Sequence, residues 1–147
     1  MNELIAKLRK EYLNSSLDIR DILKNPIEQF DKWFKEAINA QIEEPNAMAL
    51  ATVNKEGQVS VRIVLLKDYS NEGFEFFTNY NSNKGKDIEF NNNIGLNFFW
   101  GILQRQVRIQ GYAYKLSEEE SEKYFNSRPL GSRISAIISP QSQKNTK

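Results

Sequence analysis

Residues 59–67 read VSVRIVLLK, and this stretch decides how the rest of the chain is interpreted. The four aliphatic residues at 63–66 stand between Arg62 and Lys67. An unbroken aliphatic run of this kind is typical of a β-strand that is covered on both faces. Ionised side chains rarely enter such a strand unless a partner compensates for the hydration that they lose. The two cations therefore predict an anion-binding site at this strand.

Four further strands are predicted around this stretch. Residues 47–53 read as a strand, and the turn at 54–57 joins them to 59–67 in a hairpin. After a turn at 68–73, the remaining predicted strands are 74–78, 94–100 and 105–116. Five strands connected mainly by short turns, with helices at both ends, indicate a small antiparallel barrel with helical decoration.

Two capping signals mark the starts of helices. Asn25 has the character of an N-cap, Pro26 suits the first helical position, and Glu28 stands at the capping-box spacing. Ser117 and Glu120 repeat this spacing later in the chain. With the apolar periodicity, these signals predict helices at 2–12, 26–38, 84–90 and 118–125. The whole chain, 1–147, is expected to form a single domain with a helical N-terminal segment of about 1–43.

Composition limits the chemistry that the side chains can perform. The 147 residues carry a net charge of +1 and include neither cysteine nor histidine. These absences exclude disulfides, thiol nucleophiles, imidazole acid–base catalysis and the commonest zinc ligand. Carboxylates alone can bind Mg²⁺ or Ca²⁺, but no EF-hand-like cluster of aspartates is present, so no metal site is expected. An enzyme of this composition would depend on a bound organic cofactor for its reactivity.

The same composition argues against two classes of partner. A net charge near zero does not provide a broad basic surface for nucleic acid, and no apolar run approaches the roughly 20 residues of a membrane span. The N-terminus lacks the features of a signal peptide, so a cytoplasmic protein is expected. A nucleic-acid-binding barrel is the alternative, but core packing accounts better for its candidate stacking residues, Phe76, Phe77, Phe98, Phe99 and Trp100.

Donor groups near the central strand suit a phosphate. Thr78 ends a predicted strand, and Ser82 and Lys84 follow in a polar loop before a predicted helix. Neighbouring strands can bring these groups toward Arg62 and Lys67. Guanidinium, ammonium, hydroxyl and helix N-terminal groups are the donors that phosphate sites use. The alternative is that each lysine is a solvated surface charge.

Polar residues in the second half of the chain have two readings each. Gln106 lies in QRQVR at 104–108, where its amide suits either the edge of a heterocycle or an exposed strand face. Tyr124, Arg128 and Ser132 are spaced four residues apart, but Pro129 makes one continuous helix face improbable. From spacing alone, Arg128 is either a second anion ligand or a charge at a helix end.

Several motifs occur in order along the chain: RIVLLK at 62–67, FFTNYNSNKG at 76–85, RQVRIQG at 105–111, EKYFNSRPLGS at 122–132 and SPQSQ at 139–143. Together with LRKEY at 8–12 and NPIEQFDKWFKEA at 25–37, they resemble the pyridoxine/pyridoxamine 5′-phosphate oxidase family. The resemblance implies a mainly β fold with α, an FMN-binding split β-barrel that is antiparallel and Greek-key-like with flanking helices. It also implies a homodimer with FMN at the subunit interface.

The activity that the resemblance implies is that of a pyridoxal 5′-phosphate synthase. Such an enzyme oxidises pyridoxine 5′-phosphate and pyridoxamine 5′-phosphate to pyridoxal 5′-phosphate, and it reduces O₂ to hydrogen peroxide. A hydride would leave the C4′ carbon of the substrate for flavin N5. The alternative is a truncated or non-catalytic split-barrel protein that binds FMN or pyridoxal phosphate without turnover.

The resemblance also implies roles for individual residues. FMN would be bound by Arg62, Ile63, Val64, Leu65, Leu66, Lys67, Phe77, Thr78, Lys84, Gln106, Gln141 and Ser142, and Ser82 joins this set as a phosphate donor. Substrate would be bound by Arg9, Lys10, Glu11, Tyr12, Lys67, Tyr124, Arg128 and Ser132. Lys67 and Arg128 are the catalytic candidates.

The chain departs from the family pattern at two places. Asn83 stands where the family usually has a basic residue between the serine and the lysine. The family also continues with a Trp-containing strand and an Arg-x-His segment, so a chain that ends at Lys147 is expected to lack them.

Arg62 and Lys67 pose a geometric problem because they are five positions apart, an odd number, in a strand whose side chains alternate between two faces. A regular strand points such residues to opposite faces. If both reach one ligand, the strand must bulge or end near Lys67, or the lysine must curl over the edge.

Overall fold

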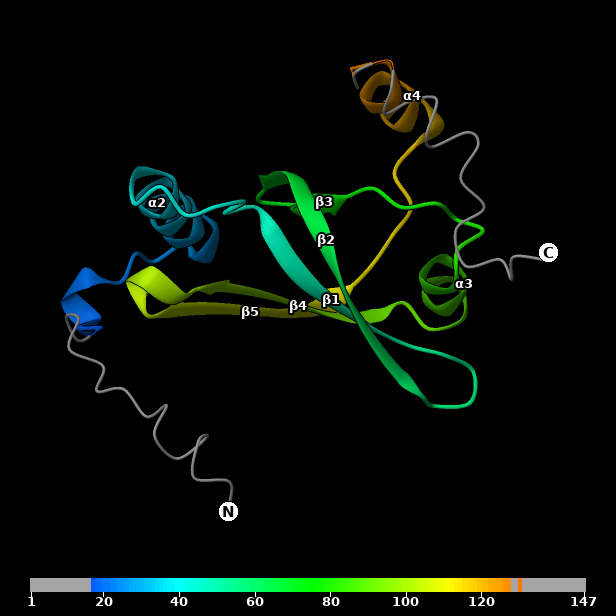
Figure 1. Ribbon diagram of the computed structural model, residues 1–147, viewed down its shortest axis with the longest axis horizontal. Helices are drawn as coiled ribbons and strands as arrows, with labels where there is room; N and C mark the ends of the chain where they lie inside the picture. The colour runs from blue at the N-terminus through cyan, green and yellow to red at the C-terminus, as the bar shows by residue number, and fades with distance from the viewer. Residues whose placement is uncertain (1–16, 128–129, 131–147) are drawn as a thin grey trace.

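The computed structural model describes residues 17–127 and residue 130. These residues form one antiparallel sheet with the strand order β3-β2-β1-β4-β5, which curls into a half-barrel (Figure 1). The strands are β1 (Ala47–Val53), β2 (Val59–Ser70), β3 (Gly73–Phe76), β4 (Asn93–Trp100) and β5 (Arg105–Tyr112). Three strands joined by hairpins, with the fourth returning beside the first, form a Greek key. The predicted antiparallel, Greek-key architecture is confirmed.

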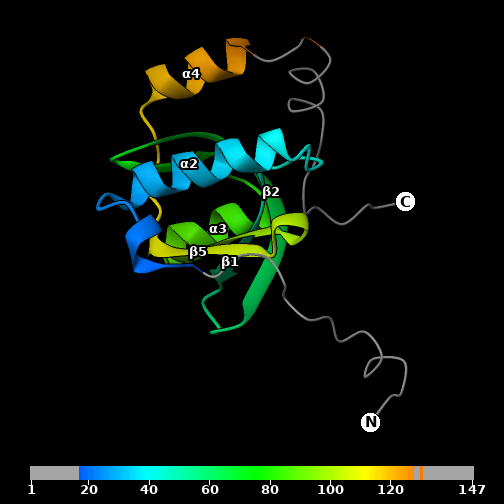
Figure 2. The same ribbon diagram turned by 90° about the vertical axis from the view of Figure 1, so that its left-hand side faces the viewer.

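Three α-helices flank the sheet. They are α2 (Pro26–Asn39), α3 (Asn83–Phe90) and α4 (Glu118–Ser127), with 3₁₀ turns η1 (Ile19–Asp21) and η2 (Gly101–Leu103). Figure 2 shows α2 lying across the sheet, and Figure 1 shows α4 set apart from it beyond β3. No helix in residues 17–127 is long and apolar enough to cross a bilayer.

Both predicted caps are confirmed. Asn25 Oδ1 accepts hydrogen bonds from the backbone N–H groups of Ile27 and Glu28 at 2.8 and 3.4 Å. At α4, Ser117 Oγ accepts from the backbone N–H of Glu120 at 3.2 Å, and the Glu120 carboxylate accepts from the Ser117 N–H at 3.0 Å. Each helix therefore begins where its capping side chain satisfies otherwise unpaired N–H groups.

The hydrophobic core lies between α2 and one face of the sheet, which we call the inner face. The Phe30 ring of α2 packs against Phe98 and Trp100 of β4, with ring centroids 5.1 and 6.1 Å away. Met48 and Leu50 of β1 are buried on the same face. Alternate residues of β1 and β4 face this core, as the pleat of a strand requires.

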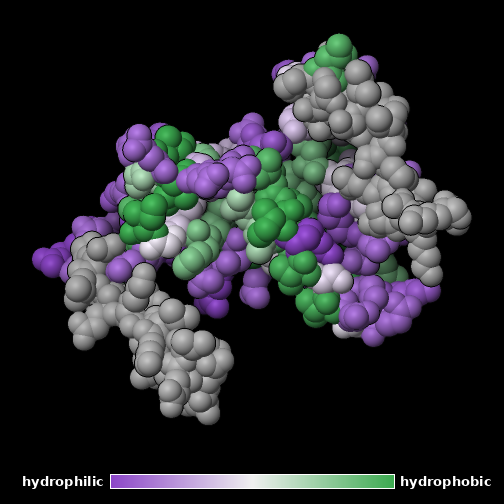
Figure 3. All heavy atoms as spheres, in the orientation of Figure 1, coloured by the Kyte–Doolittle hydropathy of each residue, from purple (hydrophilic) through white to green (hydrophobic). Residues whose placement is uncertain are grey.

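The opposite, outer face of the sheet is exposed in the described chain. Val59, Val61 and Ile63 of β2 are 62%, 64% and 66% exposed. Figure 3 shows hydrophobic atoms at the surface along the β1–β2 hairpin. The prediction that this strand is covered on both faces is therefore wrong for the single chain.

Three strands end at a different residue from the one predicted, and β3 and β4 each begin one residue earlier than predicted. β2 continues to Ser70, because Asp68–Ser70 pair with β3 and Tyr69 packs its ring against Phe30. β5 ends at Tyr112 and not at residue 116, because Tyr112 pairs with Asn93, the first residue of β4. β3 ends at Phe76, two residues before the predicted end. The predicted helix at 2–12 lies outside the described residues, and the single-domain assignment stays a prediction.

Candidate functional site

The loop before α3 places hydroxyl and cationic groups around the start of that helix. Ser82 is fully buried, and its hydroxyl donates to the Asn79 carbonyl at 2.6 Å and accepts from the Gly85 N–H at 3.3 Å. Lys84, in the first turn, has its Nζ 3.4 Å from Ser82 Oγ. A helix N-terminus carries partial positive charge, so a cation in its first turn strengthens its preference for anions.

Gly85 is required for this loop to close on the helix. A Cβ at this position would collide with the backbone carbonyl of Tyr80. Only glycine therefore allows the chain at 79–80 to approach α3 so closely.

Arg62 approaches α3 from the inner face of β2. Its Nη1 donates to the Leu50 carbonyl at 3.1 Å and to Thr52 Oγ1 at 2.7 Å. Its Nη2 lies 3.8 Å from Asp87 Oδ2 of α3. The guanidinium is thus held between β1 and the helix whose N-terminus carries Lys84.

The electrostatics of these groups favour a bound anion. Burial lowers the pKa of Lys84, and the positive charge of Arg62 lowers it further. An anion between the two cations would relieve both costs. Thr78 Oγ1 is buried and has no hydrogen-bond partner among the described residues, so an unused donor lies near the same loop. We call Arg62, Thr78 and Lys84 the anion site, and their donors suit a phosphate monoester. The prediction that Ser82 is a phosphate donor is wrong for this arrangement, because its one hydroxyl proton goes to the Asn79 carbonyl.

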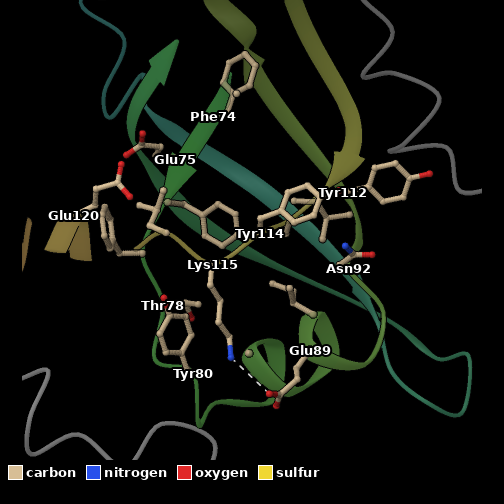
Figure 4. Close-up of a pocket in the computed structure, with 18 of the residues that line it drawn as sticks. Phe74, Glu75, Thr78, Tyr80, Glu89, Asn92, Tyr112, Tyr114, Lys115 and Glu120 are labelled. Carbon is tan, nitrogen blue, oxygen red and sulfur yellow. Dashed lines mark ion pairs between the residues drawn. The ribbon is translucent and has the colours of Figure 1, made fainter. Parts of the chain in front are cut away.

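An aromatic cleft of about 750 Å³ opens beside this site (Figure 4). It lies between β3, α3 and the chain after β5, and Thr78 and Gly85 are among its lining residues. Its aromatic walls are formed by Phe74, Phe76, Phe77, Tyr80, Phe90, Tyr112 and Tyr114. A cleft of this size and composition suits a planar organic ligand.

Charged side chains line two opposite parts of the cleft. Lys115 Nζ lies 3.5 Å from Glu89 Oε1 and 5.1 Å from the centre of the Tyr80 ring. At the other end, Glu75 lies beside Glu120 (Figure 4), and burial followed by the charges of Asp68, Glu120 and Glu72 raises the pKa of Glu75. The cleft is therefore acidic at the β3 end. In residues 17–127, no cluster of three or more acidic side chains is arranged to hold a metal ion.

Phe77 and Tyr124 are brought into contact, although the sequence predicts different ligands for them. Their rings stack with centroids 3.5 Å apart and an interplanar angle of 8°. The contact joins α4 to the chain after β3. A predicted cofactor residue and a predicted substrate residue therefore meet at one wall of the cleft.

β2 has a bulge at Lys67, which is one of the geometries that would let Arg62 and Lys67 reach one ligand. The register of β2 against β3 shifts between Leu66 and Asp68, which leaves Lys67 as the extra residue. Lys67 is exposed, and it lies about 16 Å along the strand from Arg62. That both side chains contact one ligand stays a prediction.

The other predicted β2 and β5 residues divide between the two faces. Val64 and Leu66 are buried in the core, whereas Ile63 and Leu65 alternate with them onto the outer face. Gln106 pairs with Phe99, which is 71% exposed, so Gln106 also lies on the outer face. The sheet therefore separates Gln106 from Arg62. The remaining predicted residues lie outside the described part of the chain: Arg9, Lys10, Glu11, Tyr12, Arg128, Ser132, Gln141 and Ser142.

Two residues that contact the site were not predicted. Thr52 and Asp87 hydrogen-bond to each other at 2.8 Å, and Thr52 also binds Arg62. A signal for Thr52 exists in the sequence, because strand alternation places it on the same face as Met48 and Leu50. A hydroxyl at such a position needs a partner. No local pattern marks Asp87.

Comparison with known proteins identifies relatives over most of the chain. The sequence profile described as pyridoxamine 5′-phosphate oxidase matches residues 34–147. Proteins named pyridoxine/pyridoxamine 5′-phosphate oxidase from Burkholderia mallei (strain SAVP1) and Burkholderia thailandensis are each 55% identical to the chain over 138 residues. The match covers 94% of this chain and 64% of each relative, so the chain spans less than two thirds of their length.

Two solved structures share the fold. PhzG from Burkholderia lata 383, in complex with tetrahydrophenazine-1-carboxylic acid, has a TM-score of 0.86 and 26% identity, covering 91% of this chain and 67% of PhzG. A pyridoxamine 5′-phosphate oxidase-related, FMN-binding protein from Nostoc punctiforme has a TM-score of 0.66 and 14% identity, covering 86% and 70% of the two chains. These similarities confirm the predicted split-barrel fold.

Proposed function

The chain belongs to the pyridoxamine 5′-phosphate oxidase family, and on that premise we propose that it binds FMN and oxidises phosphorylated forms of vitamin B6. The substrates would be pyridoxine 5′-phosphate and pyridoxamine 5′-phosphate, and the product pyridoxal 5′-phosphate. O₂ would accept the two electrons and two protons removed from the substrate, giving hydrogen peroxide. For the amine, water would then replace the nitrogen, which leaves as ammonia.

The anion site is the observation that supports FMN most directly. Arg62 and Lys84 supply two cations, and Thr78 supplies a buried hydroxyl without a partner among the described residues. The glycine at 85 brings the loop against the helix N-terminus. These donors fit the phosphate of FMN, and the adjoining aromatic cleft fits a planar ring system.

Each residue of the site would have a binding or orienting role. Bound FMN would supply the redox chemistry, by accepting a hydride from the substrate and passing the electrons to O₂. Arg62 and Lys84 would hold the phosphate, and the stacked Phe77 and Tyr124 rings would limit access of water to the cleft. Lys67, exposed at the bulge, would contact the distant end of the flavin and the substrate.

We also propose that the functional unit is a homodimer formed through the outer face of the sheet. Val59, Val61 and Ile63 form an exposed apolar row there, which is typical of an interaction surface. Asn97 Oδ1 on the same face is buried without a partner in the described chain. Gln106 lies on this face and cannot share a ligand with Arg62 of its own chain, so a second copy would supply it.

Flavin content tests the proposal first. The purified protein, loaded with FMN, should be yellow and show a flavin absorption spectrum. Failure to bind FMN on reconstitution would refute both the oxidase and a non-catalytic flavin-binding module.

Anaerobic substrate addition then tests the reaction. Pyridoxine 5′-phosphate should bleach the flavin, and admitting O₂ should restore the colour and produce pyridoxal 5′-phosphate. Bound flavin that no B6 phosphate bleaches would favour the non-catalytic module. Bleaching by tetrahydrophenazine-1-carboxylic acid alone would contradict the assignment of the substrate but not that of the cofactor. The cytoplasmic location stays a prediction, which fractionation of cells would check.

A further inference from the structure

Arg62 depends on a hydrogen-bonded pair of residues that belongs to two other elements. Thr52 of β1 is 0% exposed and sits on the inner face, diagonally across from Arg62, which pairs with Leu50. Its Oγ1 accepts from Arg62 Nη1 at 2.7 Å and donates to Asp87 Oδ2 at 2.8 Å. Two hydrogen bonds thus link a guanidinium of β2, a hydroxyl of β1 and a carboxylate of α3 in series.

The direction of these hydrogen bonds is set by chemistry. A guanidinium can only donate, and a carboxylate oxygen accepts. The single Thr52 proton therefore points to Asp87, and a lone pair of Thr52 Oγ1 faces Arg62. Without the carboxylate, the hydroxyl could rotate and lose this alignment.

The arrangement leaves part of the guanidinium for a ligand. Both hydrogen bonds that Arg62 makes within the described residues use Nη1. Nη2 lies 3.8 Å from Asp87 Oδ2, which is an ion-pair distance beyond a direct hydrogen bond. The pair thus anchors one nitrogen without occupying Nε and Nη2.

We propose that Thr52 and Asp87 are positioning residues for phosphate recognition by Arg62, an inference that rests on the proposed FMN site. Asp87 orients the Thr52 hydroxyl, and that hydroxyl fixes the guanidinium in the direction of the anion site. The pair thereby sets the selectivity of the chain for a phosphorylated flavin over the same flavin without phosphate.

Comparing FMN with riboflavin tests this role, because the two flavins differ only in the phosphate. Thr52→Val keeps the shape of the side chain and removes its hydroxyl. We expect it to weaken FMN binding about tenfold and leave riboflavin binding unchanged, as measured by quenching of flavin fluorescence. Thr52→Ser should restore most of the FMN affinity. Equal weakening for both flavins, or no change for either, would overturn the proposal.

Asp87 provides a second test that does not alter the buried strand. Asp87→Asn and Asp87→Leu remove the same charge, but only the asparagine can still accept the Thr52 proton. We expect the leucine variant to bind FMN about tenfold more weakly than the asparagine variant, with equal riboflavin affinities. Equal FMN affinities would contradict the proposal. A wild-type chain that binds riboflavin as tightly as FMN would instead refute the phosphate site itself.

Discussion

Lys84 combines partial burial with a positive neighbour, and in the proposed FMN site this combination would favour binding of the phosphate. Its pKa is lowered by burial and then by Arg62. A lysine in this state gains more from an anion than an exposed lysine does, because the anion offsets both the desolvation and the repulsion. The hydroxyl of Thr78, which has no partner among the described residues, adds a donor without adding charge.

FMN affinity should therefore depend on pH through Lys84. Phosphate raises the pKa of Lys84 when it binds, so affinity is highest below the lowered pKa of the free protein. It falls as pH rises from that pKa to the pKa of the complex. Fluorescence titration between about pH 7 and 11 measures this, above the second phosphate ionisation near 6. Lys84→Met should bind FMN about tenfold more weakly at neutral pH, and its affinity should no longer fall over this pH range.

Lys86→Met is the matched control, because Lys86 is an exposed lysine on the same helix. It should keep both the FMN affinity of the wild type and the fall of that affinity with rising pH. If the affinity of Lys84→Met still falls with pH as it does in the wild type, the titrating group is not Lys84.

Glu75 should make folding less favourable at neutral pH. Its pKa in the folded protein is raised, first by burial and then by Asp68, Glu120 and Glu72, so between the unfolded and folded pKa values the folded state holds a proton that the unfolded state has already lost. Stability therefore falls as pH rises above 4.5, the ordinary pKa of glutamate, toward the raised pKa.

Glu75→Gln should remove this loss. At pH 7 we expect a gain of less than about 1 kcal/mol in the free energy of unfolding, since solvent screens the neighbouring charges. At pH 4 we expect no gain. Urea unfolding at both pH values measures the difference, and the exposed Glu122→Gln on α4 should show neither effect. A gain of equal size at both pH values would exclude a role for ionisation.

At the scale of elements, the start of α3 depends both on its local sequence and on how closely the preceding loop packs against it. The Ser82 cap and the first turn are local features, but the loop at 79–80 must approach the helix closely to complete the site. Gly85 permits that approach because any Cβ there would collide with the Tyr80 carbonyl.

Gly85→Ala should destabilise the protein and weaken FMN binding. Alanine favours a helix by about 1 kcal/mol over glycine, but the collision should reverse this and cost a net of roughly 1–3 kcal/mol. Denaturant unfolding and FMN titration measure the two effects. Gly111→Ala on β5 is the control, because a Cβ there has nothing within 4 Å. Stabilisation by Gly85→Ala would show that the loop does not need its close approach.

At the scale of the whole molecule, α2 buries one face of the sheet, and the other, apolar face is exposed in the part of the chain that the structure describes. The exposed row on β2 is flanked by the small residues Ala49 and Ala51 of β1, which pair with Ile63 and Val61. An exposed apolar surface of this kind is costly to leave in water and is typical of an interaction site. It also carries Gln106, which one chain cannot combine with Arg62.

Ile63→Glu should therefore abolish dimerisation and weaken FMN binding together. A carboxylate in the centre of an apolar interface loses hydration without gaining a partner, and this costs several kcal/mol. Analytical ultracentrifugation and flavin content measure the two properties. Ile19→Glu is the control, since Ile19 is an exposed apolar residue, 84% accessible, that lies in η1 and not in a strand. A wild-type monomer that binds FMN fully would contradict the proposed dimer.

Local signals predicted much of the fold, and they singled out the hydroxyl and ammonium groups that the structure places around the start of α3. β1 spans Ala47–Val53 as predicted, and the caps at Asn25 and Ser117 lie where the sequence places them. These features depend on side chains within four residues of one another. The extent of β2 and β5 was not predictable in the same way, because it depends on which strand lies alongside.

The sequence by itself determined the order in which the functional groups follow one another along the chain: a cationic strand, then a hydroxyl-rich loop, then a capped helix. Only the tertiary structure decided that Arg62 faces inward to Thr52 and Asp87 while Gln106 faces outward. Alternation assigns two faces to a strand but does not say which face another element covers. Thr52 and Asp87 are 35 residues apart, and their contact exists because packing of α3 against β1 brings them together. Most donors of the anion site are close together in the sequence, but the orientation of Arg62 within it depends on tertiary packing.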